Sequence, residues 1–327
     1  MLQKILSLTD DIIHGKRLDA EEATFLLDVS GSDLSAVLAG ADRLREHFFD
    51  RKIEVCSIIN AKSGRCSENC AFCAQSAHHQ SDVPVYPLKS SEEIIRQAKA
   101  ADAEGSHCFG IVTSGTRVEP GREFDDLLVA LRQIKVTTSL DPSASLGLLT
   151  PEMARALSGA GCVTYHHNLE TARSFFPQIC TTHAYDEDIE TIRIAKAAGM
   201  RVCSGGILGL GESPSQRIEL ALTLRELDVD SIPLNFLNPI DGTPLAGHRD
   251  LAPLDCVRII ALFRYLLPDK KISVCGGREP NLREFQSWIF MAGATGTMMG
   301  NYLTTSGRNR QIDLQMLLDT EMEFDAC

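Results

Sequence analysis

The segment AKAAGMRVCSGGILGLGESPSQ, residues 195–216, contains the pattern that decides the fold. Its first part is a run of small residues that ends in Gly199, and glycine can adopt the left-handed conformation that closes a helix. Residues 201–206 then form a short strand candidate. Ser213-Pro214-Ser215-Gln216 combines a capping box with proline at the first position of a new helix. The segment therefore predicts a helix, a strand and a second helix in direct succession.

The same succession recurs along the chain. Three other helical stretches end in small residues and a glycine before a strand candidate, at Gly105, Gly161 and Gly293, and further capping signals begin at Ser90 and Thr150. The strand candidates are residues 53–59, 107–113, 134–140, 162–167, 201–206, 232–236, 272–275 and 295–299. Eight strands that alternate with helices over roughly 250 residues predict an α/β fold, a (β/α)8 TIM-type barrel. An open doubly wound sheet is the alternative.

Apolar residues at helical spacing in residues 1–50 predict an N-terminal helical extension, and residues 51–327 are expected to form the barrel with a C-terminal tail. The chain has 44 acidic and 32 basic side chains, a net charge of −12. This balance argues against nucleic acid or an anionic membrane as the main partner, because both attract clustered Lys and Arg. Neither a membrane span nor a secretory signal is recognisable, so we expect a cytoplasmic protein whose 11 cysteines serve metal or redox chemistry.

The sharpest local signal is GRCSENCAFCAQSAHH, residues 64–79, in which Cys66, Cys70 and Cys73 have the spacing C-x3-C-x2-C. Three thiolates on a loop after the first strand can converge on one metal centre. Structural zinc and ordinary iron–sulfur electron carriers use four ligands, whereas three leave one iron open to bind and activate another molecule. A zinc site completed by His78 or His79, and unrelated core cysteines, are the alternatives.

With the aromatic Phe72 before its last cysteine, this loop resembles that of the radical S-adenosylmethionine (SAM) superfamily. Four further segments resemble the biotin synthase family, and the resemblance spans about residues 50–305. They are YHHNLET (165–171), VCSGGILGLGES (202–213), LNFLNPIDGTPL (234–245) and GGRE (276–279). The joint occurrence of these segments in order is far more specific than any one of them.

The resemblance implies that Cys66, Cys70 and Cys73 hold a 4Fe–4S cluster whose open iron binds SAM. It also implies that an electron from reduced flavodoxin or ferredoxin cleaves SAM to a 5′-deoxyadenosyl radical. This radical would attack dethiobiotin, and an auxiliary iron–sulfur cluster would donate the sulfur that completes biotin. Members of the family tend to form homodimers. No further catalytic side chain is expected, because the cofactors carry the radical chemistry.

The resemblance also implies roles for residues at the strand ends. Asn168 and Glu170 match residues that contact SAM and the substrate, although the family more usually has aspartate at the second position. The backbone at Gly205 and Gly206 would approach the adenosine of SAM. Asn235, together with Asn168 and His166, would bind the ureido ring of dethiobiotin. Helix capping is the alternative for these polar residues, and His166 stands where the family commonly has asparagine, so a structural histidine is equally open.

The auxiliary site departs from the family pattern. Cys108 and Cys203 match two of its three cysteine ligands, and Arg278 matches its arginine ligand. Ser143 stands where the third cysteine is usual, while Cys275 is an additional thiol. We therefore hypothesise an auxiliary centre, 2Fe–2S or larger, held by Cys108, Cys203 and Cys275. Taken singly, each of these cysteines could also be a buried small hydrophobe.

Five cysteines have no matched partner in the family pattern: Cys56, Cys162, Cys180, Cys256 and Cys327. Cys56 and Cys162 are expected to pack in strands, and Cys327 to bear no cluster. Two other functions stay open at this point. One is another radical SAM barrel enzyme, of the hydrogenase-maturation or methylornithine-synthase type. The other is a non-catalytic iron–sulfur or zinc module.

Overall fold

A computed structural model describes residues 1–324, and Cys327 lies outside them. Its parallel strands form one sheet in the order β5-β4-β3-β2-β1-β9-β8-β7-β6, which closes because β5 also pairs with β7. Strands β5 (Arg201–Cys203) and β6 (Gly206–Leu208) follow each other at one strand position of the barrel, so the barrel has eight strand positions. The predicted (β/α)8 barrel is confirmed, and the open sheet is excluded.

The remaining strands are β1 (Glu54–Lys62), β2 (Cys108–Thr113), β3 (Asp141–Ser145), β4 (Thr164–His166), β7 (Ser231–Phe236), β8 (Lys271–Val274) and β9 (Gly296–Met298). The α-helices are α1 (Leu2–Ile13), α2 (Ala20–Asp28), α3 (Leu34–Phe49), α4 (Ser91–Ala103), α5 (Arg122–Thr137), α6 (Pro151–Gly159), α7 (Tyr185–Ala197), α8 (Pro214–Glu226), α9 (Pro253–Leu266), α10 (Arg278–Leu282), α11 (Trp288–Met291) and α12 (Arg310–Asp319). Short 3-10 turns are η1 (Gly31–Asp33), η2 (Phe176–Gln178) and η3 (Arg283–Phe285).

The capping signals act as predicted. The side chains of Ser90, Thr150 and Ser213 accept hydrogen bonds from the backbone of α4, α6 and α8, which satisfies N–H groups that a helix start leaves unpaired. At the other ends, the four predicted glycine stops have positive φ angles. These are Gly105 (φ 78°), Gly161 (91°), Gly199 (81°) and Gly293 (97°). Each helix therefore ends abruptly and returns the chain to the next strand.

The third strand was expected at residues 134–140, and this prediction is wrong. Helix α5 continues to Thr137, because Leu127, Leu131 and Ile134 recur at helical spacing and are buried, while Val136 is 73% exposed. The strand begins only at Asp141.

The sequence of β3, DPSAS, has a low intrinsic preference for strands, so its placement depends on tertiary packing. Ser143 lies opposite Gly110 of β2 in the barrel. A side chain at Gly110 would meet the Ser143 Oγ at 3.4 Å and Ile58 at 3.1 Å, so this part of the barrel accommodates only small residues.

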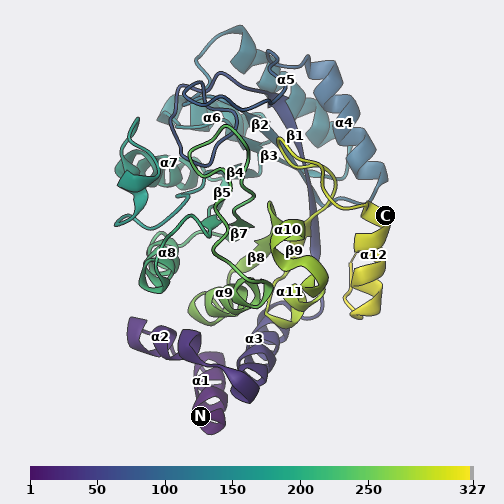
Figure 1. Ribbon diagram of the computed structural model, residues 1–327. Coiled ribbons are helices and arrows are strands. Elements are labelled where there is room, and N and C mark those ends of the chain that lie inside the picture. The colour runs from purple at the N-terminus through teal and green to yellow at the C-terminus, as the bar shows by residue number, and fades with distance from the viewer. Residues whose placement is uncertain (325–327) are drawn as a thin grey trace.

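The N-terminal residues form α1, α2 and α3, which lie below the barrel in Figure 1. Helix α3 packs against α1 and α9, and α2 packs against α8 and α9. Tyr265 of α9 joins these layers, because its hydroxyl lies 3.0 Å from the Thr9 Oγ1 and donates to the Val37 carbonyl at 3.2 Å. The N-terminal helices therefore pack on α8 and α9 of the helical layer that surrounds the barrel.

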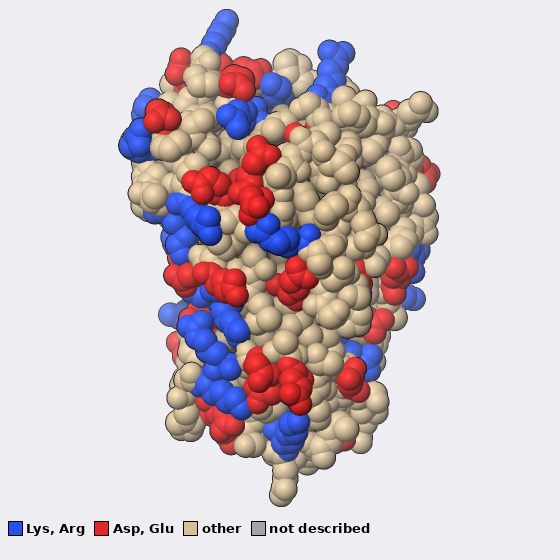
Figure 2. All heavy atoms as spheres, turned by 90° about the vertical axis from the view of Figure 1, so that its left-hand side faces the viewer, with Lys and Arg blue, Asp and Glu red and all other residues tan. Residues whose placement is uncertain are grey.

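The C-terminal helix α12 lies against the side of the barrel (Figure 1). Asp313 of α12 accepts a 2.6 Å hydrogen bond from Arg278 of α10, and both side chains are fully buried. On the face drawn in Figure 2, basic and acidic side chains are interspersed and neither kind forms a continuous surface. Within residues 1–324, no helix combines the length and the apolar character that a membrane crossing requires.

Candidate active site

A cavity of about 750 Å³ runs along the inside of the barrel. It is lined by eight of the 11 cysteines of the chain: Cys56, Cys66, Cys70, Cys73, Cys108, Cys180, Cys203 and Cys275. They come from two places. One group lies beyond the carboxyl ends of the strands, on the loop after β1 and before α7. The other lies on the strands or, for Cys275, directly after β8. The concentration of thiols in one cavity marks it as the candidate site.

The cysteine loop after β1 is folded by its own backbone. The Cys73 amide donates to the Cys70 carbonyl at 2.9 Å, and the Ala77 amide donates to the Cys66 carbonyl at 2.7 Å. The rings of His78 and His79 contact the backbone carbonyls of residues 67 and 70, both at 3.0 Å, so neither imidazole is directed at the thiols. This arrangement does not favour the zinc alternative. Burial raises the pKa of Cys73 to about 11 and also raises that of Cys66.

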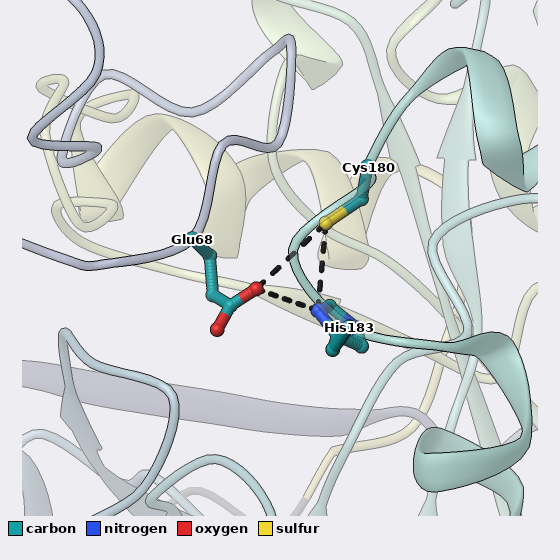
Figure 3. Close-up of side chains that lie close together, drawn as sticks. All are labelled: Glu68, Cys180 and His183. Carbon is teal, nitrogen blue, oxygen red and sulfur yellow. Dashed lines mark hydrogen bonds and ion pairs between the residues drawn. The ribbon is translucent and has the colours of Figure 1, made fainter.

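Sequence reasoning missed a second group beside this loop (Figure 3). Nδ1 of His183 lies 2.7 Å from the Glu68 Oε2 and 3.4 Å from the Cys180 Sγ, and the latter two atoms are 3.8 Å apart. On its other side, His183 places Nε2 3.2 Å from Asp188, whose second carboxylate oxygen lies 2.8 Å from His167. Glu68 belongs to the cysteine loop, so this network ties the loop to the start of α7.

The charges of this network are set by its hydrogen bonds. Hydrogen bonds to Asp188 and Cys180, followed by Glu68, raise the pKa of His183 to about 11, so the ring is an imidazolium at neutral pH. The thiol of Cys180 contacts Cys70, and this hydrogen bond lowers the pKa of Cys180 and raises that of Cys70. The only signal in the sequence is the spacing of Cys180 and His183, three residues apart before a helix, which is too common to identify a site.

Inside the barrel, Cys108 of β2, Cys203 of β5 and Cys275 after β8 line the same cavity, as their strand positions suggested. Cys56 of β1 joins them, although we expected it to pack in the core. Its Cα is the register partner of Cys108. Cys162, in contrast, is 4% exposed and packs in the core. Burial raises the pKa of Cys203 to about 12 and that of Cys275 well above its usual value.

Two further residues expected near these thiols are placed differently. Ser143 is 1% exposed within β3, and its hydroxyl has no hydrogen-bond partner among the described residues. The guanidinium of Arg278 does not line the cavity. It donates to Asp313 at 2.6 Å and to Gln286 at 2.9 Å, which leaves only its Nε without a partner in the described part of the chain.

The polar residues at the strand ends converge on the cavity. His166, Asn168, Glu170 and Asn235 all line it. Burial lowers the pKa of His166 to about 4, so this ring is neutral, and its Nε2 has no hydrogen-bond partner within residues 1–324. Burial, with the nearby Asp188 carboxylate, raises the pKa of Glu170 to about 8. The side chain of Asn235 donates from Nδ2 to the Gly206 carbonyl at 3.2 Å and accepts at Oδ1 from the Gly276 backbone N–H at 2.9 Å. These two hydrogen bonds fix the orientation of the side chain.

Gly205 and Gly206 have a clear packing role. A Cβ at Gly205 would lie 2.1 Å from the Pro233 carbonyl oxygen, and one at Gly206 would lie 2.5 Å from the Glu170 carbonyl oxygen. Their backbones also bind the segment after β4, because Gly205 donates to the Asn168 Oδ1 at 3.2 Å and accepts from Leu169 at 3.0 Å. Neither glycine lines the cavity among the described residues. They hold Asn168 and Glu170 in place from behind.

Comparisons with known proteins agree with this geometry. Residues 61–224 match the Radical SAM superfamily, and residues 233–323 match the Biotin and Thiamin Synthesis associated domain. The chain is 60% identical over 321 residues to a biotin synthase from Geobacter sulfurreducens, covering 98% of both chains. It is 58% identical over 327 residues to a biotin synthase from Syntrophotalea carbinolica, covering 100% of both.

Among solved structures, the chain is similar to methylornithine synthase, with a TM-score of 0.84, 21% identity and coverage of 98% of this chain and 97% of that one. It is also similar to HydG, a maturase of the [FeFe]-hydrogenase, with a TM-score of 0.82, 18% identity and coverage of 98% and 74%. At these identities the two structures are informative about the barrel fold alone.

Proposed function

Because the chain belongs to the biotin synthase family, we propose that it converts dethiobiotin to biotin by radical SAM sulfur insertion. The observation that carries the proposal is the pairing of this family membership with two separate groups of thiols on one cavity. One group suits a cluster that binds SAM, and the other suits a cluster that supplies sulfur.

Membership of the radical SAM superfamily implies a 4Fe–4S cluster and SAM. In our proposal Cys66, Cys70 and Cys73 hold the cluster. Two ligands of one tetrahedral zinc, each about 2.3 Å from the metal, lie within about 4 Å of each other. These three thiols are not all within 4.8 Å of one another, a criterion that only Glu68, Cys180 and His183 meet among the described residues. The wider spacing supports a centre with several metal ions.

When bound, the 4Fe–4S cluster supplies the one-electron chemistry that cleaves SAM, and the auxiliary cluster supplies sulfur. The residues of the chain bind and orient the reactants. Asn168 and Glu170 hold SAM, and the buried carboxyl of Glu170 suits ribose hydroxyl groups. Gly205 and Gly206 support this contact through the backbone at Asn168 and Glu170.

The substrate is bound on the same cavity wall. Asn235, Asn168 and His166 bind the ureido ring, and the neutral imidazole of His166 can offer either a donor or an acceptor. The free Nε2 of His166 supports this role, because a buried polar atom without a partner costs stability unless a ligand satisfies it.

The auxiliary centre, 2Fe–2S or larger, is held by Cys108, Cys203 and Cys275 in this proposal. Thiolate is the ligand that such clusters use, and all three thiols face the cavity. The charge of Arg278 lowers the pKa of the Cys275 thiol, although burial raises it by more. The guanidinium is already paired with Asp313 and Gln286, and direct ligation by Arg278 stays a prediction. Reduced flavodoxin or ferredoxin as electron donor, a homodimeric assembly and a cytoplasmic location complete the proposal, and they rest on the family resemblance.

Anaerobic turnover tests the function. The chain is reconstituted with iron and sulfide, supplied with SAM, a reductant and dethiobiotin, and the products are identified by mass spectrometry. We expect biotin together with 5′-deoxyadenosine. Cys73→Ala should form neither product, whereas Cys256→Ala, a buried helix position outside the cavity, should form both.

Deoxyadenosine without biotin would contradict the substrate and move the chain to another radical SAM reaction. If a chain with an intact cluster forms neither biotin nor 5′-deoxyadenosine, the enzymatic function is contradicted.

A further inference from the structure

Three of the four cysteines inside the barrel lie at one level, on β1, on β2 and directly after β8. Cys56 of β1 is the register partner of Cys108 in β2 on one side and of Met298 in β9 on the other. Val274 at the end of β8 pairs with Thr297 of β9. The residues that follow these two, Cys275 and Met298, therefore lie side by side. One row around the barrel therefore holds Cys108, Cys56, Met298 and Cys275.

The direction of the Cys56 side chain follows from the alternation along β1. Glu54, Cys56 and Ile58 line the cavity, while Val55 and Ile59 are 0% and 3% exposed in the core. Cys56 therefore faces inward, towards Cys203 on the opposite wall. The carboxyl-end loop with Cys66, Cys70 and Cys73 is a separate feature that begins only after β1 ends.

We infer that Cys56 is a fourth thiolate ligand of the auxiliary iron–sulfur centre, beside Cys108, Cys203 and Cys275. The inference rests on the proposed function, which requires that centre. Clusters of both the 2Fe–2S and the 4Fe–4S type are commonly held by four cysteines. Cys56 then supplies the thiolate that Ser143 lacks, from the neighbouring side of Cys108.

The arrangement suits a cluster better than the other fates of cysteine. All four are free thiols, so no disulfide uses them. No three of their sulfur atoms all lie within 4.8 Å of one another. This spacing is wider than that of the ligands of a single metal ion. Cys56 is also absent from the hydrophobic core, where a cysteine that only packs would lie.

The test compares anaerobically reconstituted chains that keep Cys66, Cys70 and Cys73. Iron and acid-labile sulfide are measured per chain, and Mössbauer and electron paramagnetic resonance spectra separate the two clusters. We expect Cys56→Ser to lose the auxiliary signal, as Cys108→Ser does, and to lose about half of the iron if that cluster has four irons. Cys162 is buried just before β4 and lies outside the cavity, so Cys162→Ser should match the parent.

A second variant, Cys56→Ala, is measured alongside, because a serine oxygen can itself bind iron. The signal of the loop cluster and the far-ultraviolet circular dichroism spectrum show that each variant is folded. If Cys56→Ala keeps the iron and the auxiliary signal of the parent while Cys108→Ser loses them, the inference is overturned and the proposed function stands. If no variant of the four cysteines changes the iron content, both the auxiliary centre and this inference fail.

Discussion

His166 shows what burial in the cavity wall does to one side chain. Its ring lies at the end of β4, buried against the cavity wall, with Nε2 unpartnered in the described structure. Burial disfavours the charged imidazolium and lowers the pKa to about 4. At this residue, the unfolded chain, in which a histidine has a pKa of about 6.5, therefore binds up to one more proton than the folded chain between about pH 4 and 6.5.

This difference predicts an acid-dependent loss of stability. The contribution of neutral His166 is fully present above about pH 6.5 and is lost as the pH falls towards 4. Relative to His166→Asn, the metal-free chain should lose on the order of 1 kcal/mol of unfolding free energy between pH 7 and pH 5. Urea unfolding of both proteins at the two pH values measures it. An unchanged difference between them would show that His166 is already protonated or exposed.

Residue by residue, the sequence predicts the site unevenly. The spacing of Cys66, Cys70 and Cys73 is local, so it can be read directly, and all three line the cavity. The position of Cys56 depends on which face of β1 turns inward and on its partner in β2, which is 52 positions later in the chain. The local sequence predicts neither of these. The contact between Glu68 and His183 joins segments 115 residues apart for the same reason.

At the scale of elements, the close packing of α3 depends on Gly40, which has no side chain. A Cβ at Gly40 would lie 1.9 Å from the Tyr265 Oη and 2.5 Å from the Thr9 Oγ1. Those two hydroxyls hydrogen-bond each other at 3.0 Å, and Tyr265 is fully buried. The close approach of α1, α3 and α9 therefore depends on glycine at this position.

Gly40→Ala should destabilise the chain, although alanine is the better helix former by about 1 kcal/mol. Overpacking a rigid core costs about 1–3 kcal/mol, and here it also displaces the Tyr265 hydroxyl, so we expect a net loss. Gly159→Ala is the matched control, because its Cβ would meet nothing within 4 Å at the end of α6. Thermal or urea unfolding of both variants decides the point. Equal stability of the two variants would contradict the packing at α3.

The elements show why most of the fold was predictable and one strand was not. Helix caps and glycine stops are local signals: the caps mark the starts of α4, α6 and α8, and the glycines follow the ends of α4, α6, α7 and α11. Strand β3 has no local signal: its residues DPSAS become a strand because β2 and β4 pair with it on both sides. Of the apolar residues before it that suggested a strand, Ile134 lies on the buried face of α5, Val136 lies on its exposed face and Leu140 follows the helix.

At the scale of the molecule, segments outside the barrel line both ends of the cavity. Phe49 at the end of α3 lines it where the strands begin. Where the strands end, the cysteine loop lines it together with residues 302–305, a segment that Asn60 holds through a 2.9 Å hydrogen bond to the Leu303 carbonyl. Exclusion of water and fixed orientation of the reactants are what a protein contributes to cofactor chemistry of this kind.

In the proposed function, both groups of thiols act on one substrate in this cavity, one through SAM and the other as the source of sulfur. The most direct test is a single turnover of enzyme whose clusters were reconstituted with heavy-isotope sulfide, run with dethiobiotin in excess unlabelled sulfide. We expect the biotin formed to carry the heavy isotope. Biotin that carries only the light isotope would contradict it, because the sulfur would then have come from solution.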